Sequence, residues 1–230
     1  MNNIFQSGLL IILCAVSMQA QVYDANDLKG TKYVEDQFYI AAGYNFLLDK
    51  PDIVVQRSLS YNLQAGFIKD LPLNARRNFA LGIGLGYGVN SYYTNVEAQE
   101  TAEGVVYALS NREGFRRSNI ETHALELPFE LRWRTSTATE YKFWRVYAGF
   151  KLAYAFVKRS KIVSDGFVNG FDNSDIQNLQ YGLMLNFGFN TWNIHAYYAL
   201  NPLLEDNVSL SNGTPFEMRT LRVGLIFYIL

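Results

Sequence analysis

One stretch, Phe79–Val89, constrains the fold more than any other part of the chain. Its odd positions carry large apolar or aromatic side chains, and its even positions carry only alanine or glycine. A period of two residues is that of a β-strand, in which successive side chains point to opposite faces of the sheet. A soluble sheet places polar groups on the face away from its core, whereas a small membrane barrel turns bulk to lipid and keeps small or polar groups inside. The stretch therefore predicts a barrel strand.

Other segments alternate in the same way, and together with this one they predict eight strands. These segments cover residues 38–48, 59–67, 79–89, 124–134, 144–156, 179–190, 192–201 and 220–229. An even number of strands lets a sheet close on itself and leaves no unpaired edge in lipid. The sequence therefore predicts an all-β fold, an eight-stranded antiparallel up-and-down transmembrane β-barrel, as one domain over residues 37–230.

The connections between these strands alternate between long and short. Two of the long ones, Ser91–Asn119 and Lys158–Asn178, are polar and charged, and we expect them to be loops that cannot cross a membrane. Lys69–Asn78 and Thr135–Lys142 are predicted to be compact turns. Bacterial outer-membrane barrels have long outer loops and short periplasmic turns. The pattern thus predicts the bacterial outer membrane, with both termini in the periplasm.

An apolar run, Leu9–Val16, lies close to the start of the chain. It is too short to span a bilayer as a helix, and it has the length of a signal-peptide core. The polar stretch that follows shows neither the strand nor the helix period. The sequence therefore predicts a signal peptide over 1–20 and a periplasmic tail over 21–36. A buried N-terminal element is the alternative.

Composition and spacing argue against several classes of function. The only cysteine is Cys14. Lipidation of this cysteine would need a small residue before it, but Leu13 stands there. Because Cys14 lies in the expected signal peptide, the chain left after cleavage would have no thiol for a metal site or a nucleophile. The 20 basic and 21 acidic residues give no electrostatic reason to expect nucleic acid. The alternating glycines of 82–88 lack the final glycine of a dinucleotide loop. No cofactor or metal is expected, and the glycines are interpreted as a small face that makes room inside the barrel.

Large charged side chains fall on the inward face of the predicted strands. The expected lumen charge network consists of Glu126, Glu130, Arg132, Arg145, Lys151 and Arg222. Isolated charges in such an interior would be costly, whereas paired charges are tolerable, so we interpret the set as a structural network that fills the lumen. A site for an ion or a small solute is the alternative. Glu130 and Arg145 lie at similar distances from the turn between their strands, which predicts an ion pair.

The 3 tryptophans have outward parity and lie near strand ends. Aromatic side chains gather at the interfaces of membrane barrels, so the sequence predicts an interfacial girdle of Trp133, Trp144 and Trp192. Chance placement of large aromatics in an ordinary core is the alternative. His123 and His195 belong to no assignable arrangement of nucleophile, histidine and acid, so no catalytic residue is predicted.

Several segments carry a resemblance to a known family. The signal-like start, the strand segment Leu125–Leu131, the glycine-alternating strands and the terminal Val223–Phe227 resemble the PorT-like family of small outer-membrane β-barrel proteins. The resemblance covers essentially the whole chain after the signal peptide and implies a Gram-negative outer-membrane β-barrel domain. The namesake of that family is implicated in type IX protein secretion and gliding, so the resemblance also implies a link to secretion.

Together these features predict a monomeric barrel that serves as a structural, assembly or interaction component of the cell envelope. Its expected partners are outer-membrane lipid and other envelope or secretion proteins. Two alternatives stay open. One is a porin-like barrel permeable to ions or small solutes, although water-filled channels need about 16 strands. The other is an outer-membrane barrel enzyme.

Overall fold

The computed structural model describes residues 37–74, 76–111, 114–135 and 143–229. The strands in these ranges are β1 (Gln37–Leu48), β2 (Tyr61–Pro72), β3 (Phe79–Thr94), β4 (Val96–Thr101), β5 (Gly104–Leu109), β6 (Phe115–Arg134), β7 (Trp144–Ser164), β8 (Phe167–Asp172), β9 (Leu179–Phe189), β10 (Trp192–Ala199) and β11 (Arg219–Ile229). The expected signal peptide (1–20) and tail (21–36) lie outside the described residues. Among the residues that the structure describes, no helix is long and apolar enough to span a membrane.

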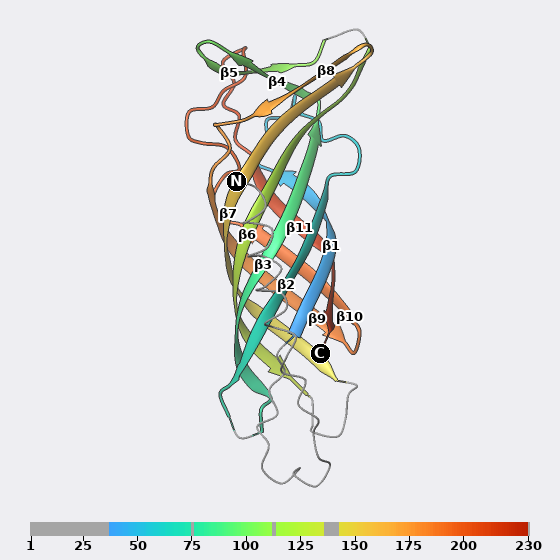
Figure 1. The fold of residues 1–230 in the computed structure, drawn as a ribbon, viewed down its shortest axis with the longest axis vertical. Helices are drawn as coiled ribbons and strands as arrows, with labels where there is room; N and C mark the ends of the chain where they lie inside the picture. The colour runs from blue at the N-terminus through green and yellow to red at the C-terminus, as the bar shows by residue number, and fades with distance from the viewer. Residues whose placement is uncertain (1–36, 75, 112–113, 136–142, 230) are drawn as a thin grey trace, which may run out of the picture. The chain divides into compact units, whose positions relative to one another are not determined.

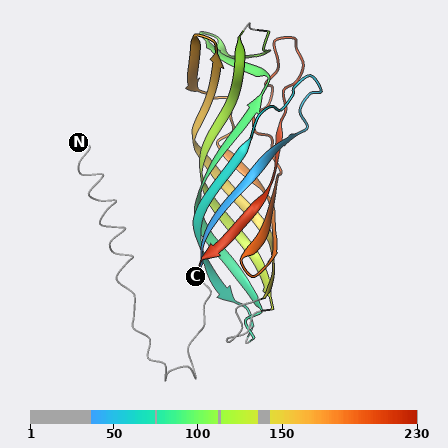
Figure 2. The ribbon, with the colours of Figure 1, turned by 90° about the vertical axis from the view of Figure 1, so that its right-hand side faces the viewer.

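Eight of the strands close into a barrel (Figure 1). β1 pairs antiparallel with β2, β2 with β3, β3 with β6, and β6 with β7. From β7 the ladder continues through β9, β10 and β11 back to β1. Figure 2 shows these strands tilted relative to the long axis of the barrel. The predicted eight-stranded antiparallel up-and-down barrel is confirmed.

The barrel wall has an apolar outer face and a buried inner face. β9 alternates strictly, with exposed residues at its odd positions and buried ones at its even positions. On β7 the outward apolar side chains run from Trp144 to Phe156. Those twelve steps span about 40 Å along the strand at about 3.3 Å per residue, or about 28 Å in height at a tilt of about 45°. This height matches the apolar band of about 25 Å that outer-membrane barrels present to lipid.

The glycines of β3 make room for charged side chains from other strands. A Cβ atom added at Gly88 would lie 2.6 Å from Oε1 of Glu126, and one added at Gly82 would lie 2.8 Å from Nε of Arg132. Both distances are shorter than real Cβ contacts. The interpretation of the glycines as a small face inside a crowded barrel is therefore supported.

Two segments that were expected to be polar loops contain strands. In Ser91–Asn119 the chain finishes β3, forms the β4–β5 hairpin and begins β6. In Lys158–Asn178 it completes β7 and pairs β8 back onto it. The pairing extends beyond the apolar band because inward residues such as Ile120 and Ile162 still alternate with polar outward ones. The sequence analysis did not predict strands at these positions.

Figure 1 shows β4, β5 and β8 at one end of the barrel, and the connections there share an apolar core. This loop core consists of Leu47, Val54, Tyr92, Val96, Ala98, Tyr107, Ile120, Ile176, Leu203, Leu204, Leu210, Phe216 and Met218. Tyr92 and Ile120 belong to barrel strands, so the loop core is continuous with the barrel interior. The Tyr107 hydroxyl accepts a hydrogen bond from Nδ2 of Asn173 at 2.8 Å. Burial raises the pKa of this hydroxyl above its ordinary value of 10.0.

Candidate functional site: the charged interior of the barrel

The charged side chains expected in the lumen are buried. The structure places Glu126, Glu130, Arg132, Arg145, Lys151 and Arg222 at 7% relative exposure or less. They come from β6, β7 and β11, where alternate side chains point inward. Because burying a charge is costly unless it is paired and hydrogen-bonded, the partners of each group decide what the interior can do.

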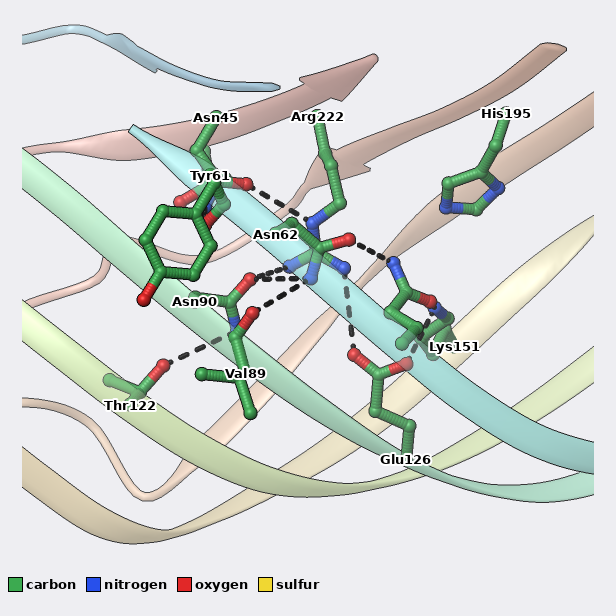
Figure 3. Close-up of polar contacts among 12 residues, drawn as sticks. Asn45, Tyr61, Asn62, Val89, Asn90, Thr122, Glu126, Lys151, His195 and Arg222 are labelled. Atoms are coloured by element: carbon green, nitrogen blue, oxygen red, sulfur yellow. Dashed lines mark hydrogen bonds and ion pairs between the residues drawn. The ribbon is translucent and has the colours of Figure 1, made fainter. Parts of the chain in front are cut away.

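Three of these residues form a central cluster (Figure 3). Nζ of Lys151 donates to Oε2 of Glu126 at 2.8 Å, and Nη1 of Arg222 lies 3.5 Å from Oε1 of the same carboxylate. The guanidinium of Arg222 also lies 4.7 Å from the ring centroid of Tyr197. One carboxylate from β6 thus joins cations from β7 and β11 across the width of the barrel.

Neutral side chains complete the hydrogen bonding of the central cluster. Lys151 Nζ donates to Oε1 of Gln64 at 2.5 Å. Arg222 donates through Nε to Oδ1 of Asn45 at 3.2 Å and through Nη2 to Oδ1 of Asn90 at 2.8 Å. Figure 3 shows Asn45, Asn90 and Glu126 reaching Arg222 from different strands. The excess of positive charge is therefore stabilised by amide oxygens as well as by Glu126.

A second set, the turn-side cluster, is defined by Asp70, Glu130, Arg132 and Arg134. Arg132 donates through Nε to Glu130 at 2.8 Å and through Nη1 to Asp70 at 3.0 Å. Its guanidinium stacks 4.5 Å from the ring centroid of Tyr147. Arg134 holds both carboxylate oxygens of Asp70, at 3.0 and 2.9 Å. Two carboxylates and two guanidiniums balance in charge, and the bidentate geometry is the strong form of such a pair.

The expected ion pair between Glu130 and Arg145 is wrong. In the β6–β7 ladder Glu130 lies opposite Gly149, and Arg145 lies opposite Arg134. Arg145 instead donates to the backbone carbonyl of Asn190 at 2.7 Å. Both side chains point inward as expected, but the strands pair four residues away from the register inferred from the turn. A slip by an even number of residues keeps every side chain on its face, so parity does not determine this register.

Asp70 and Gln64 are partners that the sequence analysis missed. Asp70 was assigned to a compact turn, but β2 continues through Pro72 and turns Asp70 inward. Continuing the alternation of Asn62 and Gln64 along the strand would have found it. Pro72 ends the strand, where a missing N–H is tolerated.

The two histidines lie in different surroundings. His195 is buried in the lumen, where its Nδ1 lies 2.6 Å from Oδ1 of Asn186, whose Nδ2 donates to Glu130 at 3.0 Å. Within the described residues, Nε2 of His195 has no hydrogen-bond partner. His123 is on the outer face of β6 and contacts the hydroxyl of Tyr87. His195 thus contacts the amide of Asn186, which in turn contacts the carboxylate of Glu130. These contacts do not place a nucleophile next to the imidazole.

The described parts of the chain contain no group of three or more His, Cys, Asp or Glu side chains that could hold a metal ion. The expected girdle residues Trp133, Trp144 and Trp192 are exposed on the outer wall. Trp144 and Trp192 both lie opposite Phe189 in neighbouring ladders, and Trp133 lies opposite Phe79. All three are next to the short turns, at the end of the barrel away from the loop core.

Comparison with known proteins bears on the fold. A family model described as "Outer membrane protein beta-barrel domain" matches residues 19–205. Curated protein sequences gave no significant match. Among solved structures, the chain is similar to the crystal structure of Ail, the attachment invasion locus protein of Yersinia pestis, at 13% sequence identity. That alignment covers 85% of this chain and 100% of that chain with a TM-score of 0.33.

Proposed function

We propose, since the chain belongs to the outer membrane protein β-barrel domain family, that this bacterial outer-membrane protein is a closed structural or interaction barrel of the cell envelope. The observation that carries the proposal is the paired charge in its interior. The Lys151–Glu126 and Arg132–Asp70 pairs lie inside the barrel, and Arg222 reaches Glu126 from β11, on the opposite side of the wall. A barrel of about eight strands has an interior just wide enough to be filled by side chains.

The loop core supports the same proposal. Its apolar side chains come from the long connections and from barrel strands, and they pack together at one end of the barrel. A connection that only bridged two strands would not need a buried core. We infer that these connections form an ordered surface for contacts with other envelope proteins.

The orientation in the membrane is part of the proposal. Phe38 near the start of β1 lies opposite Ile229 at the end of β11, so both ends of the barrel sheet lie at the same end as the short turns. Outer-membrane barrels keep their short turns in the periplasm. The loop core would then face outward, both termini would lie in the periplasm, and the tryptophan girdle would lie at the periplasmic interface.

The resemblance to the PorT-like family supports a finer assignment. We propose that this barrel acts alone as a monomer in lipid and contacts envelope proteins, with protein secretion as the process to test first. The filled interior argues against a porin-like role. The contacts of His195 give no support to an enzyme.

Cysteine labelling and crosslinking in cells test the proposal. Val168 in β8 and Leu73 after β2 are exposed and lie at opposite ends of the barrel. Val168→Cys should react with a membrane-impermeant maleimide on intact cells, whereas Leu73→Cys should react only after the outer membrane is opened. A photo-crosslinker at the same positions should capture an envelope protein. Recovery of the chain in the soluble periplasmic fraction, or the reverse labelling pattern, would contradict the proposal.

A further inference from the structure

The outer face of the β6–β7–β8 sheet carries a hollow of about 290 Å³. This outer hollow is lined by Asn119, Glu121, Arg159, Ser160, Lys161 and Gly170. It is separate from the lumen clusters, because these residues lie on the part of the sheet beyond the apolar band. The residues that line the hollow take no part in the ion pairs of the lumen clusters.

A β-bulge turns two cations toward this outer face. His123 pairs with Val157 and Ala124 pairs with Ala155, so Phe156 is an extra residue in β7. Up to Phe156 the even residues of β7 point outward, whereas beyond it Ser160 and Ile162 are buried and the odd residues point outward. A bulge is a recurrent way to re-aim side chains. Without it, Arg159 and Lys161 would point inward.

The cations of the outer hollow keep donors available. Nε of Arg159 lies 3.4 Å from Asp172, which leaves its terminal amino groups for another acceptor. Among the described residues, Lys161 has no carboxylate within ion-pair distance. Glu121, the acidic residue in the lining, lies 3.3 Å from Nε2 of His123. Opposite Lys161 in the ladder, Gly170 has no side chain, which keeps the hollow open.

The position along β7 places these cations at the level of lipid headgroups. Tyr87 and Phe156, with ring centroids 6.1 Å apart, are exposed on the outer wall at the side of the hollow that faces the apolar band. Arg159 and Lys161 follow Phe156 by three and five residues, which is about 10 to 17 Å along the strand and about 7 to 12 Å in height at a tilt of about 45°. The headgroup layer is about 5 to 7 Å thick, and long cationic side chains can reach back into it.

We propose that the outer hollow binds the phosphate group of an anionic lipid whose acyl chains lie against the Tyr87 and Phe156 wall. Arg159 and Lys161 supply charge-assisted donors to the phosphate oxygens, and the amide of Asn119 lies beside them. Basic pockets next to membrane-spanning segments recognise anionic headgroups in this way. The continuity of the hollow with the apolar wall selects a lipid-borne phosphate over a free one.

The test measures lipid binding to the folded full-length protein in detergent. Lipid A, which carries phosphate on an acylated sugar, is titrated and bound molecules are counted by native mass spectrometry. The double variant Arg159→Gln/Lys161→Gln should bind lipid A at least fivefold more weakly than the parent. The matched control Arg57→Gln/Arg116→Gln removes two exposed cations outside the hollow and should bind as the parent does. The conservative Arg159→Lys/Lys161→Arg variant should retain most of the binding.

Three results would overturn the proposal. The first is equal binding of lipid A by the parent and by Arg159→Gln/Lys161→Gln. The second is equal affinity of the parent for phosphatidylcholine, which would mean that a phosphate with an exposed negative charge is not required. The third is displacement of lipid A by an equimolar amount of inorganic phosphate, which would mean that the acyl chains contribute nothing. Heat-modified gel mobility of each variant confirms that the barrel is folded before lipid is added.

Discussion

Substitution of Glu126 by glutamine should destabilise the barrel more than any other single change in the central cluster. The carboxylate lies 2.8 Å from Nζ of Lys151 and 3.5 Å from Nη1 of Arg222, and all three groups are buried. Glu126→Gln keeps the size of the side chain but leaves two buried cations without a counter-charge. Breaking a buried ion pair from one side costs about 3 to 5 kcal/mol of unfolding free energy.

The partner substitution should cost less, because Lys151→Met leaves Glu126 with Arg222 still in reach. In Glu126→Gln/Lys151→Met the unpaired ammonium is gone as well. The double variant should therefore be more stable than Glu126→Gln by at least about 1 kcal/mol, within the range of coupling energies between contacting residues.

Urea unfolding of the protein in lipid vesicles measures these differences. The folded fraction is read from gel mobility without heating and, independently, from tryptophan fluorescence. A conservative surface change, Arg57→Gln, serves as the control and should shift the unfolding free energy by less than about 0.5 kcal/mol. Two results would refute this reasoning. One is a loss of unfolding free energy in the double variant that equals the sum of the losses in the two single variants. The other is a Glu126→Gln variant that is as stable as the parent.

Other predictions concern the glycine face, the loop core and the girdle. Gly88→Ala should cost about 1 to 3 kcal/mol in urea unfolding because its Cβ would overlap Glu126, whereas the matched Gly170→Ala should be close to neutral. Because burial raises the folded-state pKa of Tyr107 above 10.0, this residue's contribution to stability is complete below about pH 10 and declines at higher pH. Protection of the loops against protease should therefore fall above about pH 10, and this fall should be smaller in Tyr107→Phe. At neutral pH, Tyr107→Phe should lower the free energy of opening the loops by about 1 kcal/mol, because it removes a hydrogen bond. Tryptophan fluorescence should be quenched more by lipids brominated near the headgroup than by lipids brominated near the chain ends, and equal quenching would refute an interfacial girdle.

The strand number and the inward or outward face of each barrel strand follow from the sequence because both depend on a period of two residues. The alternation of bulky and small residues in Phe79–Val89 determines which side faces lipid, and the same rule puts Glu126 and Lys151 inside. These properties are local, so a single sequence contains them.

Register and loop structure depend on contacts between distant residues, which a single sequence does not reveal. The pairing of Glu130 with Gly149 could not be inferred, because an even shift preserves parity. The loop core brings Val54, Tyr107 and Phe216 together from three different connections. Since each connection alone is polar and short of apolar residues, its strands become stable only when the others pack against it.

Single-channel recording tests the closed interior most directly. The folded full-length protein is inserted into a planar bilayer, and the current is recorded over a range of voltages. Because the Lys151–Glu126 and Arg132–Asp70 pairs lie inside the barrel and the loop core lies at one end of it, we predict a bilayer that stays electrically silent after insertion has been verified by gel mobility. Stable, large and ion-selective openings of the parent protein would contradict a closed barrel.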